Sequence, residues 1–228
     1  MAMRIDIISA VPDLLKSPLE TSIIKRAQDK KKVEIVVHNL RDYTHDKHKQ
    51  IDDKPFAGGP GMLLKPEPFF ECIELLQSER KYEHIIFTTP SGNKYDQKAA
   101  NKFSLANNII IIAGHYKGID DRVREVFATD EISIGNFVLS GGELLALVIV
   151  DSVVRLIPGV LNDSESALND SFMDGEVIEA PYYTRPAEFR GMRVPDVLLS
   201  GNEKEIKKWK NEQSLILTEK WKNKNRLE

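Results

Sequence analysis

The chain has 228 residues, of which 41% are hydrophobic and 29% charged, and its formal net charge is -3 at pH 7. This length supports one sizeable core, or one large domain with a small appendage. The composition is that of a soluble globular protein. A net charge this close to zero excludes a globally basic surface, so any basic surface for nucleic acid must be local.

Cys72 is the only cysteine, which excludes an intramolecular disulfide and a metal site built on paired cysteines. The first ten residues lack the basic flank of a signal peptide. The longest apolar run, residues 144–150, is too short to span a membrane. We therefore expect a soluble, cytoplasmic protein.

Short runs rich in β-branched residues alternate with longer amphipathic stretches. The runs predict strands that are buried on both faces, and the stretches predict helices. This alternation is typical of an α/β domain with a mostly parallel sheet and helices on both faces. The predicted strands are residues 4–9, 33–38, 84–89, 108–113 and 132–134, and the predicted helices are residues 17–31, 66–78, 96–105 and 144–157.

The C-terminal part has a different character. Residues 161–176 are polar and acidic without apolar periodicity, which predicts a flexible linker between a domain at 1–160 and a second at 177–228. Residues 202–226 predict one or two helices and are locally basic. Trp209 and Trp221 on this tail could stack on RNA bases or pack in a small core.

Three glycine-containing loops follow the predicted strands, at residues 89–92, 113–118 and 135–142. Ligands of open α/β sheets bind at the carboxyl ends of the strands, and Ile134 and Leu139 could sandwich a flat ring there. For any one loop a tight turn is the better explanation, but three such loops at successive strand ends favour a site. Ser140, three residues before Glu143, predicts a helix cap. Neither a GxGxxG nor a GxxxxGK[ST] motif is present, which disfavours Rossmann dehydrogenases, P-loop enzymes and Rossmann-type methyltransferases.

A fourth loop, residues 52–62, contains three glycines and two prolines and predicts a shaped loop or a solvated connection. The motif in this loop is DDKPFAGGPGM, and the further motifs of the chain are AGHYKGIDDRV (113–123), SIGNFVLSGGEL (133–144), RLIPGVL (155–161), DSF (170–172) and PYYTRP (181–186). With these motifs, the chain resembles the TrmD family of tRNA (guanine-N1)-methyltransferases. The resemblance covers essentially the whole chain, with the motifs in the family's order.

The resemblance implies a SPOUT-type fold, in which the chain around residues 86–139 forms a deep trefoil knot. It also implies a homodimer with the site at the subunit interface, where S-adenosylmethionine (AdoMet) binds bent in the knot loops. The linker and the small, mainly helical C-terminal domain of one subunit would close over the AdoMet of the other and bind tRNA. The implied reaction is methylation of N1 of guanosine 37, the nucleoside 3′ of the anticodon.

Site residues carry over by motif. Asp170 matches the family's general base, which would remove the N1 proton, and Arg155 matches an arginine that would stabilise charge developing on O6. From composition alone, Asp170 is a solvated charge and Arg155 complements a helix dipole. The implied cofactor-binding residues are Pro90, Gly114, Tyr116, Ile134, Gly135, Asn136, Phe137, Val138, Leu139, Gly141 and Gly142.

The chain departs from the family in the loop at residues 113–118, where His115-Tyr116-Lys117 stands in place of the family's frequent Arg-Tyr-Glu. The family's glutamate is linked to the use of Mg²⁺, and an ammonium group cannot ligate a cation. No protein ligand for Mg²⁺ is therefore assigned. Two other hypotheses stay open: a catalytically silent RNA-binding relative, and a knotted methyltransferase acting on ribosomal RNA.

Overall fold

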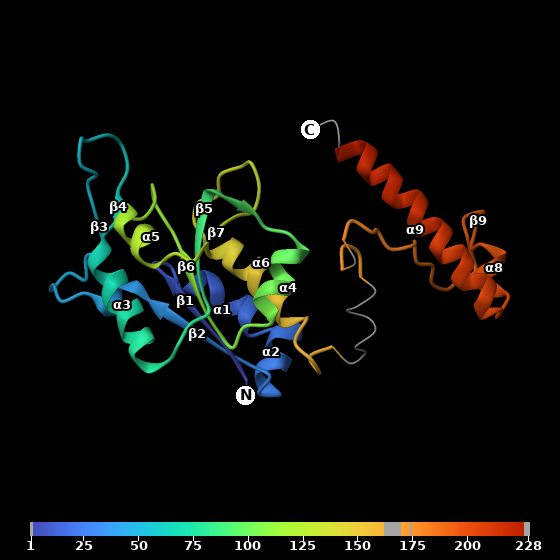
Figure 1. Ribbon diagram of the computed structural model, residues 1–228, viewed down its shortest axis with the longest axis horizontal. Helices are drawn as coiled ribbons and strands as arrows, with labels where there is room; N and C mark the ends of the chain where they lie inside the picture. Colours follow the sequence, from blue (N-terminus) through green and yellow to red (C-terminus); the bar gives the residue numbers. More distant parts are fainter. Residues whose placement is uncertain (1, 162–169, 174, 226–228) are drawn as a thin grey trace. The chain divides into compact units, whose positions relative to one another are not determined.

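Residues 2–161, 170–173 and 175–225 are described by the computed structural model. They fall into two units, Met1–Asn162 and Asp163–Glu228 (Figure 1). The first unit contains the sheet and all the predicted strands. The predicted linker falls largely on residues 162–169 and 174, which lie outside the described residues.

A five-stranded sheet forms the centre of the first unit, in the order β2-β1-β6-β5-β7. Every neighbouring pair is parallel, which confirms the predicted α/β class. The trefoil knot implied for residues 86–139 stays a prediction. The strands are β1 (Met3–Ser9), β2 (Val33–Asn39), β5 (His84–Lys94), β6 (Asn108–Ala113) and β7 (Asp130–Ser133).

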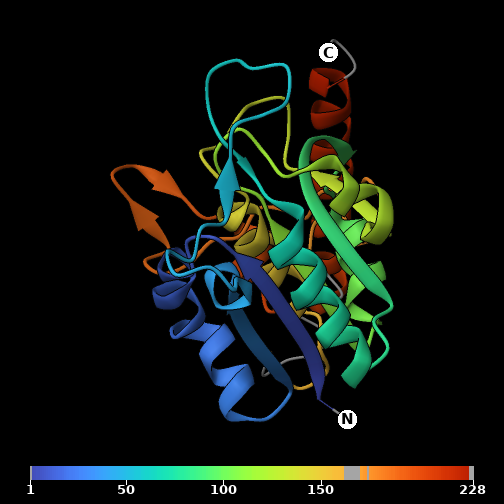
Figure 2. The ribbon, with the colours of Figure 1, turned by 90° about the vertical axis from the view of Figure 1, so that its left-hand side faces the viewer.

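Helices lie on both sides of this sheet (Figure 2), and a hydrophobic core lies on each of its two faces. In β6, Ile109 and Ile111 point into one core while Ile110 and Ile112 point into the other, as the two-residue repeat of a strand requires. The first core is covered by α1 (Asp13–Leu19), α2 (Ser22–Asp29), α4 (Gln97–Ser104) and α6 (Glu143–Val154), and the second by the short 3₁₀ helix η1 (Leu40–Tyr43), α3 (Pro66–Glu79) and α5 (Asp121–Phe127).

Two helix predictions are wrong in detail. The single helix expected over 17–31 is two helices, because the chain breaks after Leu19 and Ser22 adopts a positive φ of 52°. Ser140 does not cap α6, which begins at Glu143 directly after Gly142. The Glu143 side chain is turned into the protein instead, where it accepts a hydrogen bond from Ser9.

The second unit contains a two-stranded hairpin, α8 (Asp196–Leu199) and the long helix α9 (Glu203–Asn225). One helix therefore occupies the stretch for which one or two were predicted. The half-buried Trp221 contacts the ring of Phe172 edge-on, and Trp209 lies near Tyr183, which favours packing over a free stacking surface. The hairpin strands are β8 (Glu188–Phe189) and β9 (Met192–Arg193).

A buried polar network connects β1 to its neighbours in the first unit. The carboxylate of Asp6, fully buried, contacts Arg4 at 2.7 Å, His38 Nε2 at 2.7 Å and the Tyr82 hydroxyl at 2.8 Å. Burial alone would raise the pKa of Asp6, but the hydrogen bonds from His38, Arg4 and Tyr82 outweigh burial and lower the pKa to about 2. The network thus stabilises the charged form of Asp6.

We expect Asp6→Asn to lower the free energy of unfolding by about 3 kcal/mol near neutral pH, because it leaves buried partners unpaired. The lowered pKa of Asp6 contributes stability that is present above about pH 4 and is lost as the pH falls through about 2. The difference between variant and wild type should therefore shrink by roughly 2 kcal/mol at the acidic end. Urea unfolding of both proteins, from neutral pH down to about pH 2, measures this difference in the free energy of unfolding.

The matched control is Asp42→Asn, which removes an exposed carboxylate 3.2 Å from Lys49. Its cost should stay below about 1 kcal/mol at every pH. Equal costs for the two variants would contradict the role given to Asp6.

Candidate functional site

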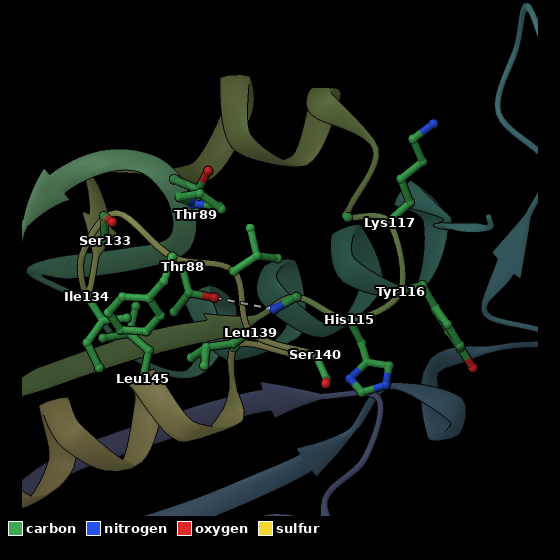
Figure 3. A pocket seen from close by; sticks show the side chains of 17 residues that line it. Thr88, Thr89, His115, Tyr116, Lys117, Ser133, Ile134, Leu139, Ser140 and Leu145 are labelled. Carbon is green, nitrogen blue, oxygen red and sulfur yellow. Dashed lines mark hydrogen bonds between the residues drawn. The ribbon is translucent and has the colours of Figure 1, made fainter. Parts of the chain in front are cut away.

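Three loops meet at the carboxyl edge of the sheet and enclose a pocket (Figure 3). The first loop is a bulge within β5 and the other two follow β6 and β7, and these three strands are neighbours in the sheet. Their meeting confirms the geometry expected from the glycine-containing loops. The lining residues are Thr88, Thr89, Pro90, Gly114, His115, Tyr116, Lys117, Gly118, Ser133, Ile134, Phe137, Val138, Leu139, Ser140, Gly141, Gly142 and Leu145.

The first wall of the pocket is a bulge within β5. The strand pairs with β7 as far as Thr88, then shifts register, and pairs with it again from Asn93. The residues between are pushed out of the ladder, and Thr89 and Pro90 reach the pocket. Gly92 allows β5 to return to its pairing with β7 after the bulge, because a Cβ at this position would lie 2.5 Å from the backbone of Glu131.

The second and third walls are joined by their backbones. The amide of Gly142 donates to the carbonyl of Gly114 at 2.6 Å, and His115 forms an isolated β-bridge with Gly141. A side chain at Gly142 would overlap Thr88 Oγ1 and come within 2.9 Å of the Gly114 nitrogen. The two loops therefore approach each other at a distance that only glycine permits.

The inside of the pocket has both apolar and polar groups. Ile134, Leu139 and Leu145 lie together in Figure 3, with the hydroxyl-bearing Thr88 close to them. The Thr88 hydroxyl donates to the carbonyl of Ile112 at 2.8 Å. The cavity measures about 150 Å³, a size that in other proteins accommodates a single aromatic ring.

The loop after β6 carries three large side chains in different directions. Tyr116 has a positive φ of 59° and is 47% exposed, and in Figure 3 it points away from the apolar group. Lys117 lies against the glycine-rich loop at residues 52–62, because a Cβ added at Gly61 would be 3.4 Å from the Cβ of Lys117. The amide of Lys117 donates to the carbonyl of Met62 at 3.1 Å. The fourth loop singled out in the sequence, at the tip of β3 (Asp52–Asp53) and β4 (Leu63–Leu64), thus borders the pocket.

Nine of the eleven predicted cofactor residues line this pocket, and Gly135 and Asn136 do not. The carbonyl of Gly135 accepts from the amide of Phe137 at 2.9 Å, so this pair shapes the turn behind the lining. The sequence reading missed residues that flank the glycines, and also Leu145, which reaches the pocket from a helix. Those missed are Thr88, Thr89, His115, Lys117, Gly118, Ser133, Ser140 and Leu145.

The two predicted catalytic residues belong to different units. Arg155 is half-buried and directly follows α6 in the first unit, where its amide donates to the carbonyl of Asp151. Asp170 belongs to the second unit and accepts, through its own carbonyl, from the amide of Met173. Burial and then the charge of Asp170 raise the pKa of Glu179, which places these two carboxylates near each other.

The segment around Asp170 is more structured than the sequence suggests. Phe172 donates its amide to the carbonyl of Val177, and Ser171 Oγ accepts from the amide of Glu179 at 2.9 Å. These bonds hold residues 170–173 in a turn that packs against α9 through Phe172 and Trp221. Absence of apolar periodicity therefore does not mean absence of structure here.

The described residues contain no group of three or more His, Cys, Asp or Glu side chains that could hold a metal ion. None of their helices combines the length and apolar character needed to cross a membrane.

The family model described as tRNA (Guanine-1)-methyltransferase TrmD matches residues 3–227 of the chain. The chain belongs to the TrmD family. This membership confirms the resemblance seen in the sequence motifs, and it makes the protein an enzyme of the tRNA (guanine-N1)-methyltransferase class.

Individual relatives of the TrmD family agree over nearly the full length. A tRNA (guanine-N(1)-)-methyltransferase of Bacteroides fragilis is 55% identical over 216 residues, which are 95% of this chain and 96% of the relative. One from Christiangramia forsetii is 56% identical over 218 residues, covering 96% of each chain. The crystal structure of the tRNA (m1G37) methyltransferase from Aquifex aeolicus superposes with a TM-score of 0.76 at 38% identity, covering 92% of this chain and 88% of that one.

We expect Gly142→Ala to lower the free energy of unfolding by roughly 2 kcal/mol, because the methyl group meets backbone atoms that cannot move aside. Gly114→Ala is the comparison in the same pocket. Its Cβ would lie 3.5 Å from the side chain of Ile119, an ordinary contact, and should change stability by less than about 1 kcal/mol. Chemical denaturation of both variants measures the difference, and equal losses would contradict it.

Proposed function

We propose that this TrmD-family enzyme transfers the methyl group of AdoMet to N1 of guanosine 37 of tRNA, the nucleoside 3′ of the anticodon. The observation that carries the proposal is the ring-sized pocket built by three loops at the carboxyl edge of the sheet, in a chain of this family. The relative from Aquifex aeolicus, named for the product m1G37, supports the position. A cytoplasmic location fits this substrate.

The pocket has the groups that a nucleoside-containing cofactor needs. Ile134, Leu139 and Leu145 offer apolar sides to a flat ring, and the close-packed glycine backbones offer N–H and C=O groups to its polar edge. When bound, AdoMet supplies a methyl group activated by a positively charged sulfur. The residues proposed to bind it are Pro90, Gly114, Tyr116, Ile134, Gly135, Asn136, Phe137, Val138, Leu139, Gly141 and Gly142.

The remaining chemistry belongs to the guanine base. N1 of guanine carries a proton at neutral pH, so it must lose this proton before it can attack a methyl group. We assign the removal of the proton to the carboxylate of Asp170. As the proton leaves, negative charge develops on O6, and the guanidinium of Arg155 stabilises it. The rest of the protein aligns the two reactants for in-line transfer.

A homodimer explains how one site uses two units. A cavity of about 150 Å³ suits a ring, whereas sites for ligands as large as AdoMet are usually bigger. We propose that a second copy of the chain completes the site, with the Asp170 segment and the C-terminal unit of one subunit closing over the cofactor of the other. The ordered turn at residues 170–173 supports a base that is held by its own unit.

The second unit has a surface suited to RNA. Residues 182–193 are exposed throughout, and they combine aromatic rings with arginines. Phe189 is 55% exposed, and the guanidinium of Arg190 lies 5.2 Å from the centre of its ring. Arginine planes and exposed rings are the groups on which unpaired RNA bases stack, and the guanidinium also binds phosphate.

The proposed reaction predicts transfer of label from labelled AdoMet to a tRNA transcript that has guanosine 3′ of the anticodon. A transcript with adenosine at that position should stay unlabelled, because adenine N1 carries no proton and adenine has no O6. Label on both transcripts would contradict the proposed position. Label on neither, with AdoMet still bound, would favour a silent RNA-binding relative or a ribosomal RNA substrate.

We expect Asp170→Asn to lower turnover by roughly 10²–10³-fold, since an amide cannot accept the N1 proton. AdoMet binding should change little, because the base contacts the nucleoside and not the cofactor. The same label-transfer assay, with calorimetric titration of AdoMet, measures both quantities. Glu176→Gln is the control, because it removes an exposed carboxylate of the same segment that pairs with Lys222 at 3.1 Å. Wild-type turnover in Asp170→Asn would place the base elsewhere.

A further inference from the structure

A carboxylate and an imidazole behind the wall of the pocket each have one buried polar atom without a hydrogen-bond partner among the described residues. Glu143 is 1% exposed, and its Oε1 accepts a hydrogen bond from Ser9 Oγ at 2.8 Å. Its second oxygen, Oε2, and the Nδ1 atom of His115 are both buried, and neither has a hydrogen-bond partner among the described residues. The two atoms are 3.6 Å apart, just too far for a hydrogen bond.

This arrangement destabilises the protein unless Glu143 and His115 come close enough to form a hydrogen bond. A buried carboxylate is unfavourable without full hydrogen bonding, and Ser9 satisfies only one of the two oxygens of Glu143. Buried polar groups in folded proteins are nearly always paired, so each exception calls for a physical explanation. Among the described residues, the ion-pair partner of Glu143 is His115, at the long separation of 3.6 Å.

The position of the pair ties it to the pocket. His115 lines the pocket from the loop after β6, and Glu143 begins α6 directly after the glycine turn that forms the opposite wall. A side chain at Gly141 would overlap Glu143 Oε2 and lie 2.5 Å from His115 Nδ1, so the two groups meet beside this glycine. In Figure 3 the imidazole lies near Ser140, on the far side of the loop from Lys117.

We propose that His115 is a positioning residue for the cofactor: its Nδ1–H donates to Glu143 Oε2 when AdoMet occupies the pocket, and this bond holds the loop after β6 closed against the glycine turn. The inference rests on the proposed function, because it assigns AdoMet to this pocket. Polar contacts at functional sites often stand long in the free protein and tighten only in the complex. Shortening a 3.6 Å contact to hydrogen-bond length requires a loop shift of less than 1 Å.

The backbone explains why such a small shift matters. The loop is already bonded to the glycine turn through the Gly142 amide and the Gly114 carbonyl. The side-chain contact between His115 and Glu143, which joins the same two walls, is still longer than a hydrogen bond. Closing it brings Gly114 and Tyr116, which line the pocket on either side of His115, into a fixed position around the ligand.

Calorimetric titration of the full-length chain with AdoMet tests the proposal. We expect His115→Ala to weaken AdoMet binding roughly 10-fold, the scale of a lost hydrogen bond to a charged group. His115→Asn should bind within about 3-fold of wild type, because its amide N–H can take the place of Nδ1–H. In the label-transfer assay, the loss in His115→Ala should appear mainly as a higher KM for AdoMet and much less as a lower kcat, because the proposal gives His115 a role in holding the cofactor.

A double-mutant cycle separates coupling from general damage. In a Glu143→Gln background, His115→Ala should weaken binding little further, because its partner is already changed. His45→Ala is the matched control, since His45 forms an exposed pair with Glu71 at 2.6 Å that does not line the pocket. It should bind AdoMet as wild type does. The ring-nitrogen NMR signals of His115 should move on addition of AdoMet, and those of His45 should not.

The outcomes distinguish the two claims. If the wild-type chain does not bind AdoMet, the proposed function fails and this inference fails with it. If the wild type binds and His115→Ala binds equally well, the inference alone is overturned. Additive losses in the cycle, or a failure of His115→Asn to restore binding, also overturn it, because they show a role in stability and not in positioning.

Discussion

The parallel pairing of β6 with β1 on one side and β5 on the other is the constraint on which the site depends. Four successive isoleucines, Ile109 to Ile112, are buried alternately in the two cores, so β6 cannot shift by one residue without exchanging its faces. Parallel pairing then brings the carboxyl ends of neighbouring strands to one edge. The three pocket loops start from that edge, and their mutual position follows from the register of the sheet.

Backbone contact between the loops adds a second level of order. The sheet alone places the loops near one another, but the hydrogen bond from the Gly142 amide to the Gly114 carbonyl fixes their separation. That separation excludes side chains, so Gly141 and Gly142 are required by packing as well as by any ligand. A pocket made of backbone in this way is rigid and presents amide and carbonyl groups in fixed directions, which suits recognition of a flat polar ring.

Hydrophobic patterning predicted the strands well because burial on both faces leaves an unbroken apolar run, as in residues 108–113. It failed where the backbone departs from regular geometry. The break between α1 and α2 depends on a positive φ at Ser22, which no apolar pattern encodes. The continuation of β5 to Lys94 depends on renewed pairing with β7, a contact with residues about 40 positions away that local sequence does not show.

Glycine marked the loops of the site, and the family motifs marked individual residues in them, but side chains that arrive from other elements were not predicted. The motifs led to nine of the lining residues, whereas Leu145 reaches the pocket from a helix whose register the loop sequence does not reveal. Thr88 lies at the end of a strand pattern, and its part in the site follows from the bulge after it. These residues are positioned by tertiary contacts, which a single sequence leaves undetermined.

Glu143 shows the same limit most sharply. A serine three residues before a glutamate, ahead of an apolar run, is the usual sign of a helix cap, and by local rules that interpretation was sound. The helix instead begins at Glu143, and the carboxylate turns inward to a serine 134 residues away in the sequence and to His115. One four-residue pattern thus has two physical outcomes, a solvated cap or a buried charge beside a pocket. Which one occurs depends on whether the protein interior supplies a donor, and in this chain the donor is the hydroxyl of Ser9, at 2.8 Å from the carboxylate.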